Sequence, residues 1–129
     1  NTNNHEKLLN YSIYNNFEDI TNKIIEKLNS ENKKSKLKEA IFNTSNNEII
    51  KKLLKMDNII IDKEIARYII SKYNLENIKI LISLTNEKIL EINDLEKLYT
   101  KWYEHINNYI LTLKLNEYVE VIFSLNKLI

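Results

Sequence analysis

The stretch Ser45-Asn-Asn-Glu-Ile-Ile-Lys-Lys-Leu-Leu54 combines the two signals of an amphipathic helix. Ser45 and Glu48 have the spacing of a capping box, in which each side chain accepts a hydrogen bond from a backbone N–H at the helix start. Behind them, apolar residues recur at the three- and four-residue intervals of one helix face. These are Ile49, Ile50, Leu53 and Leu54. The stretch therefore predicts a capped helix with one buried face.

The rest of the sequence shares this helical character, because none of its 129 residues is glycine or proline. An average chain of this length would carry about nine glycines and about six prolines. Phosphate-binding loops, dinucleotide fingerprints and nucleophile elbows all need glycine, so those enzyme motifs are excluded. Tight β-hairpins also prefer glycine. We therefore expect an all-α fold in which asparagine, the residue that best tolerates the left-handed conformation after glycine, ends helices.

Apolar spacing predicts further helices on the N-terminal side. Residues 1–4 (NTNN) are expected to fray. Asn16 is expected to cap a helix, and a short helix should follow the lysine-rich residues 32–38. The inward positions of the first of these helices are Phe17, Ile20, Ile24 and Leu28, and those of the second are Leu37, Ala40 and Ile41.

On the C-terminal side, Asp62 is expected to cap a helix and Asn74 to end that helix and open another. The inward residues are Ile65, Ile69 and Tyr73 in the first, and Leu75, Ile78, Leu81 and Ile82 in the second. Two stretches rich in β-branched residues, 57–62 and 118–123, are both assigned to helix or connector, because a single strand would lack a partner.

Thr85 is predicted to cap the longest helix, whose apolar residues keep three- and four-residue intervals over about 22 residues. They are Ile92, Leu95, Tyr99, Trp102, Ile106, Tyr109 and Leu113. A last helix should start at Asn116, with Val119, Ile122 and Phe123 inward. The prediction is one all-α domain over residues 1–129, an irregular bundle of seven to eight helices with one long helix near the C-terminal end.

Composition limits the chemistry. The formal net charge is +1, no cysteine is present, and His5 and His105 are the only histidines. Neither a zinc-ligand pattern nor a carboxylate pair with a reason to be buried is visible, so we expect no metal, no cofactor and no catalytic residue. Ile, Asn and Lys supply 61 of the 129 residues, which indicates an AT-rich genome.

The lysines do not indicate a nucleic-acid partner. Lysines cluster at Lys33, Lys34, Lys36 and Lys38 and again at Lys51, Lys52 and Lys55. Acidic Glu31, Glu39 and Glu48 dilute the cluster, and the one arginine, Arg67, lies elsewhere, so a solvated face is expected.

The sequence does not identify a compartment. Its longest apolar run is three isoleucines at 59–61, far short of a membrane span of about 20 residues. No secretory leader is visible. Because the first residue is Asn rather than Met, the sequence leaves open whether it is part of a longer chain.

The order of the helices after Asn47 resembles a known family. A leucine-rich helix at 49–56 is followed by helices at 61–70 and 75–84, then by one starting within 87–96 and carrying Leu98-Tyr-Thr-Lys-Trp102. From Asn47 to Ile106 this is similar to the N-terminal "LW" domain of transcription elongation factor S-II and its relatives, including the integrase-binding domain of the lens-epithelium-derived growth factor family. The likeness makes Leu98 and Trp102 the core signature.

That resemblance implies a non-catalytic protein–protein interaction module, nuclear in location, that binds short disordered motifs, often acidic with an aromatic residue. It implies contacts at two inter-helix loops, 41–47 and 84–88. The partner-binding residues would be Ile41, Phe42 and Asn43 in the first loop and Leu84, Thr85, Asn86 and Glu87 in the second.

The apolar pattern from Ile92 to Leu113 leaves an alternative of another class. Its heptad-like intervals are also typical of a seam between two chains. The alternative is a structural or oligomeric helical subunit, intracellular or exported, that self-associates through this seam. A buried stripe within one bundle is the competing interpretation, because the flanking helices also need a packing surface.

Overall fold

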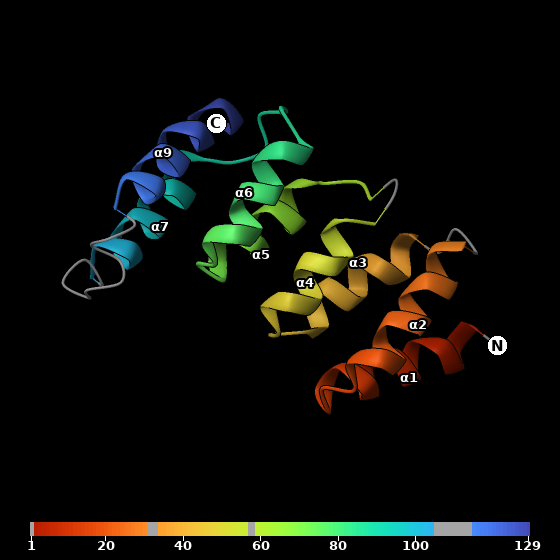
Figure 1. Cartoon of the computed structure of the whole chain (residues 1–129). Coiled ribbons are helices and arrows are strands. Elements are labelled where there is room, and N and C mark those ends of the chain that lie inside the picture. Colours follow the sequence, from red (N-terminus) through yellow and green to blue (C-terminus); the bar gives the residue numbers. More distant parts are fainter. Residues whose placement is uncertain (1, 31–33, 57–58, 105–114) are drawn as a thin grey trace. The chain divides into compact units, whose positions relative to one another are not determined.

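The computed structural model describes residues 2–30, 34–56, 59–104 and 115–129, which form eight α-helices, one short 3-10 helix and no strand (Figure 1). This confirms the all-α class, and the stretches 59–62 and 118–123 are connector and helix as expected. The chain divides into two compact units, Asn1–Ile60 and Ile61–Ile129. Each unit has its own core. The expectation of a single domain stays a prediction.

The first unit contains α1 (Thr2–Tyr14), α2 (Glu18–Ser30), α3 (Lys34–Asn43) and α4 (Asn47–Leu54). Helix α3 packs against each of the other three helices, and α1 also packs against α2. Two buried hydroxyls join α1 to α2, since Thr21 Oγ1 lies 2.8 Å from Ser12 Oγ. The core consists of Leu9, Ile13, Ile24, Ile25, Leu28, Ala40, Ile41, Ile49, Ile50, Leu53 and Leu54.

Helix α1 begins at Thr2, and the expected fraying of residues 1–4 stays a prediction. The helix is held by Leu9 and Ile13, which are buried against the rest of the unit. The predicted inward face of α2 was half wrong. Ile24 and Leu28 are buried, but Phe17 and Ile20 are exposed, because Thr21 and Ile25 complete the inner face.

Asn16 ends α1 rather than capping α2. Its φ is +58°, the left-handed conformation, and the backbone bonds on either side form a Schellman motif. Phe17 N donates to Ser12 O at 2.9 Å and Asn16 N donates to Ile13 O at 3.1 Å. The Phe17 ring also packs against Tyr11, with 6.0 Å between ring centroids. Asparagine therefore replaces glycine here as the general prediction requires.

The stripe of α4 is confirmed, since all four of its apolar residues are at most 3% exposed. Its cap is Asn46, one residue after the predicted Ser45. The Asn46 side chain accepts from the N–H groups of Glu48 and Ile49 at 3.0 and 3.4 Å. The Thr44 hydroxyl fixes the residue by accepting from Asn46 N at 3.0 Å. The Asn46 side chain thus reaches the first N–H groups of the helix, whereas Ser45 is exposed.

The second unit contains α5 (Lys63–Ser71), α6 (Leu75–Leu84), α7 (Ile92–Glu104), α9 (Leu115–Leu125) and the 3-10 helix η1 (Asn126–Leu128). Helix α9 packs against α6 and α7, and α5 packs against α6 and α7 (Figure 1). The core consists of Ile65, Ala66, Ile69, Ile70, Leu75, Ile78, Leu81, Leu90, Leu95, Leu98, Val121, Leu125 and Leu128.

Two of the caps predicted in this unit are confirmed. Asp62 accepts from Ile65 N at 2.9 Å, and Asn74 accepts from Asn77 N at 3.0 Å. However, α5 ends at Ser71, and Tyr73 takes the left-handed conformation with φ +58°. Tyr73 was therefore wrongly placed on the inner face of α5. It lies between the two helices with its side chain exposed.

Helix α7 begins at Ile92, seven residues after the predicted cap at Thr85. Thr85 is extended, with φ −147° and ψ 145°, and its hydroxyl accepts from Glu87 N at 3.2 Å. Leu90 is buried, and its N–H donates to Leu128 O at 2.8 Å. Because this N–H bonds to the C-terminal segment, the connector stays out of the helix. The predicted positions Ile106, Tyr109 and Leu113 lie outside the described residues.

Candidate functional site

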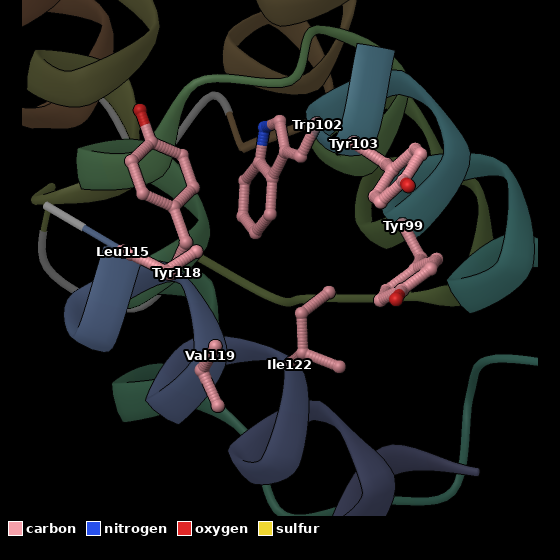
Figure 2. A pocket seen from close by; sticks show the side chains of 7 residues that line it. All are labelled: Tyr99, Trp102, Tyr103, Leu115, Tyr118, Val119 and Ile122. Carbon is pink, nitrogen blue, oxygen red and sulfur yellow. The ribbon is translucent and has the colours of Figure 1, made fainter. Parts of the chain in front are cut away.

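A groove between α7 and α9 in the second unit has a mostly apolar lining (Figure 2). It encloses about 530 Å³, open solvent included. Side chains of both helices line it, with Tyr99 and Tyr103 on one side and Tyr118, Val119 and Ile122 on the other. The full lining is Tyr99, Trp102, Tyr103, Leu115, Tyr118, Val119 and Ile122.

Helical spacing explains why these residues meet. Positions 99, 102 and 103 lie on one face of α7, and positions 115, 118, 119 and 122 lie on one face of α9. The core uses adjoining positions of the same helices. Leu95 and Leu98 of α7 are buried, as are Val121 and Leu125 of α9. The apolar surface of each helix is therefore wider than the part that the core covers.

Trp102 forms the floor of the groove. Its indole meets the Tyr118 ring edge-on, with 4.6 Å between centroids and 86° between ring planes. Its Nε1–H donates to Tyr73 O at 3.1 Å, so the left-handed turn after α5 also positions the tryptophan. Partial burial, together with the nearby Glu76 carboxylate, raises the pKa of the Tyr118 hydroxyl. The indole and the Tyr118 ring are thus held in place before any ligand binds.

The groove continues into a wider apolar surface, which we call the α7–α9 face. Tyr99 and Tyr103 stack along its edge, with 6.2 Å between centroids and 16° between planes. Six of its side chains are 41–71% exposed, and three are half-buried. The exposed six are Ile92, Tyr99, Tyr103, Leu115, Val119 and Phe123, and the half-buried three are Trp102, Tyr118 and Ile122.

This face corrects the sequence prediction for both helices. Tyr99 and Ile92 were expected inside the bundle, as were Val119 and Phe123, yet all four are exposed. The reason is that Leu95, Leu98, Val121 and Leu125 already fill the space beneath α7 and α9. Of the core signature, Leu98 is buried as expected, whereas Trp102 is half-buried in the groove.

The partner-binding residues predicted from the family resemblance lie elsewhere. Ile41 is fully buried, and Phe42 and Asn43 continue α3 to its end, so this segment is helix rather than loop. Leu84 ends α6, Thr85 follows as its C-cap, and the exposed Asn86 and Glu87 belong to the connector before α7. The two segments belong to different units, and the two-loop site stays a prediction.

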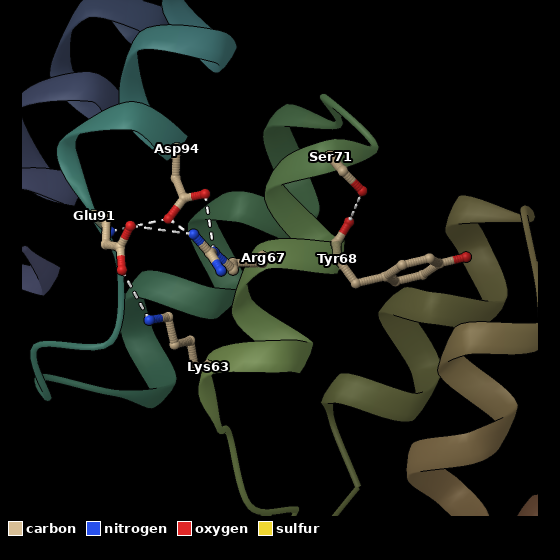
Figure 3. Close-up of polar contacts among 6 residues, drawn as sticks. All are labelled: Lys63, Arg67, Tyr68, Ser71, Glu91 and Asp94. Atoms are coloured by element: carbon tan, nitrogen blue, oxygen red, sulfur yellow. Dashed lines mark hydrogen bonds and ion pairs between the residues drawn. The ribbon is translucent and has the colours of Figure 1, made fainter.

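A cluster of charged side chains joins α5 to the start of α7 (Figure 3). Arg67 Nε lies 3.1 Å from both carboxylate oxygens of Asp94, and Lys63 Nζ lies 3.0 Å from Glu91 Oε1. Asp94 also accepts from Glu91 N at 2.9 Å and so caps α7. The hydrogen bond and charge of Lys63, helped by Arg67, lower the pKa of Glu91. The cluster therefore consists of hydrogen bonds and ion pairs that connect α5 to the start of α7.

Two further kinds of site are absent from the described residues. No three His, Cys, Asp or Glu residues there come together as metal ligands, and no helix there is long and apolar enough to cross a membrane. His105 and Lys33 lie outside the described residues, and of the His5 side chain nothing is described. Of the other lysines in the cluster, Lys52 forms an ion pair with Glu18 of α2.

Comparison with protein-family models, with curated proteins and with solved structures gives no match to this chain. The likeness to the elongation-factor domain therefore stays a prediction. The α7–α9 face must be interpreted from its own residues. One signal for it was present in the sequence, because α9 carries apolar residues on more sides than a single core can cover.

Proposed function

We propose that this chain is a non-catalytic protein–protein interaction module that binds an apolar segment of a partner on the α7–α9 face. The observation that carries the proposal is the exposure of six large apolar side chains on two neighbouring helices. Contiguous apolar surface of this kind marks interaction sites on proteins, whereas scattered apolar residues do not. Tyrosine, tryptophan and phenylalanine are also the residues enriched at interface centres.

The shape of the site supports a helix or a short extended motif as the bound element. A groove between two helices accepts an amphipathic segment whose anchors enter at regular intervals. Here the Trp102 indole and the Tyr118 ring offer a preformed floor, and Tyr99 and Tyr103 offer a wall. Little side-chain freedom would be lost at these rings on binding, which favours affinity. An anchor such as phenylalanine fits this lining.

Charged groups lie on a different side of α7 from the groove. A second, polar hollow contains Lys97, Lys101, Glu96 and Glu104 together with Tyr73. The Lys101 ammonium lies 5.5 Å from the centre of the Tyr73 ring. The lysines would attract acidic residues flanking an aromatic anchor and raise the association rate. This is the acidic, aromatic motif that the elongation-factor likeness implies, and a transcription-elongation partner is part of the proposal on that basis.

Trp102 makes the proposal testable without a label, because it is the only tryptophan. The probe is a disordered acidic peptide containing phenylalanine, titrated into the chain at low micromolar concentration. We expect a saturable blue shift of the Trp102 emission as the peptide removes water from the groove. Val119→Lys should abolish the shift, because it places a charge in the lining.

The matched control is Tyr14→Lys, since Tyr14 is 86% exposed and belongs to the first unit. It introduces the same charge away from the groove and should leave the titration unchanged. Amide chemical shifts then locate the peptide. Shifts confined to 41–43 and 84–87 would restore the two-loop site, and no shift at millimolar peptide would overturn the motif-binding function.

A further inference from the structure

We infer that the α7–α9 face pairs with the same face of a second copy of this chain in a two-fold symmetric dimer. The inference rests on the proposed function, since it names one partner for the same surface. In a dimer of this symmetry, one patch serves both subunits and must complement itself. Three observations on the α7–α9 face meet that condition: its area, its charge and the order of its side chains.

The exposed apolar area is the amount that a standard dimer needs. Tyr99, Tyr103 and Phe123 are 58–71% exposed, which corresponds to about 350 Å² of accessible surface, hydroxyls included, for residues of roughly 150–250 Å² each. Ile92, Leu115 and Val119 add on the order of 150 Å². Stable interfaces bury about 800 Å² per partner, of which roughly 60% is apolar. The estimate of about 500 Å² matches that apolar share, whereas a short peptide would cover only part of it.

The charges permit self-pairing. The whole chain carries a net charge of only +1, so two copies do not repel each other strongly. Glu96 of α7 lines a hollow together with Ile92, Tyr99 and Ile122 of the face, whereas Lys97 and Lys101 line a separate hollow that contains none of these three. The side chains of the face itself are uncharged, so two copies bring no like charges together within it.

The order of the side chains also suits a two-fold axis. Aromatic residues line the α7 side at Tyr99 and Tyr103, and the α9 side presents Leu115, Val119 and Ile122 beside the Tyr118 ring. When α7 of one copy lies on α9 of the other, rings meet aliphatic side chains at both symmetry-related places. The four helices then pack as a bundle with side chains at three- and four-residue intervals.

The test is the molecular mass of the whole chain as a function of concentration, by sedimentation equilibrium from low micromolar to near-millimolar protein. The unpaired chain has a mass of 15.5 kDa. We expect a reversible rise to twice that mass and no further, because a two-fold contact is closed. Tyr103→Lys and Val119→Lys should each weaken pairing by about tenfold or more, since each buries an unpaired charge. Tyr14→Lys should pair as the unmodified chain does.

Three results would overturn the pairing. One is a constant 15.5 kDa over the whole concentration range. The second is a dimer that survives both lysine substitutions in the face, and the third is a mass that climbs beyond two copies. Helical circular dichroism of each variant confirms that it is folded. The peptide titration of Trp102 is read separately at low concentration, so a monomer that still binds peptide rejects the dimer and leaves the proposed function standing.

Discussion

Helices α4 and α9 are of similar length and both are rich in apolar residues, but they use them differently. In α4 the four apolar residues form one stripe, and all four are buried. Lysine and glutamate occupy the other side. In α9 only Val121 and Leu125 are buried, while Leu115, Val119 and Phe123 are exposed. One helix matches its apolar surface to the core, and the other carries more apolar surface than its core covers.

The comparison separates the apolar surface that stabilises the fold from the apolar surface that is left exposed. A helix with a single apolar stripe has one way to pack, and the stripe then serves stability. A helix with apolar residues on two sides leaves one side in water, which is unfavourable unless that side is covered by a ligand or partner. The excess apolar surface of α9, and of α7 beside it, is therefore the part of the molecule best explained by binding.

The largest expected effect is the loss of folding stability when a buried residue of α4 is truncated. Leu53→Ala empties a fully buried position and should lower the free energy of unfolding by about 2–5 kcal/mol, through lost transfer energy and the cavity left behind. Val119→Ala in α9 should change it by less than about 0.5 kcal/mol, because this side chain is already partly in water. Urea unfolding followed by circular dichroism measures both.

The slope of free energy against urea should stay the same in these two variants, which shows that the unfolded state is unchanged. A loss at Val119→Ala comparable to that at Leu53→Ala would mean that α9 contributes its outer side to the core. The assignment of that side to binding would then be wrong.

A smaller effect sharpens how α4 starts. Asn46→Ala should cost about 1 kcal/mol, because it removes the acceptor for the N–H groups of Glu48 and Ile49. Ser45→Ala should be nearly neutral, since the Ser45 side chain is exposed and is not the cap. Urea unfolding of the two variants compares adjacent residues in the same loop. Equal costs would support the capping box that the sequence suggests.

These helices show what the sequence could and could not predict. The α4 stripe, the caps at Asp62 and Asn74 and the all-α class follow from local patterns that tertiary packing does not oppose. The exposed side of α9 could not be predicted, because a helix with apolar residues on two sides can bury either of them. The connector before α7 was missed because the bond from Leu90 N to Leu128 O joins distant residues.

The left-handed turns allow a comparison between the units at a still smaller scale. Asn16 and Tyr73 both have φ near +58°, but tyrosine tolerates this conformation less well than asparagine. Tyr73→Gly should therefore raise the free energy of unfolding by about 0.5–1 kcal/mol, and Asn16→Gly by less. Thermal unfolding of the two variants gives the order. A loss at Tyr73→Gly would show that the tyrosine ring, beside Lys101, outweighs the backbone strain.

The smallest effect concerns two exposed ion pairs, Lys52–Glu18 in the first unit and Lys63–Glu91 in the second. Hydrogen bonds from Lys52 and Lys63 lower the pKa values of Glu18 and Glu91 below their ordinary 4.5. A carboxyl with a lowered pKa in the folded state stabilises it above the unfolded pKa, and this contribution is lost as pH falls through the folded value. Stability should thus decline slightly as pH drops below about 4.5, and Glu18→Gln and Glu91→Gln should each flatten that decline. Because Glu91 also faces Arg67, Glu91→Gln should flatten the decline more than Glu18→Gln does. Urea midpoints measured at pH 3 to 6 test this order. A larger flattening by Glu18→Gln would contradict it.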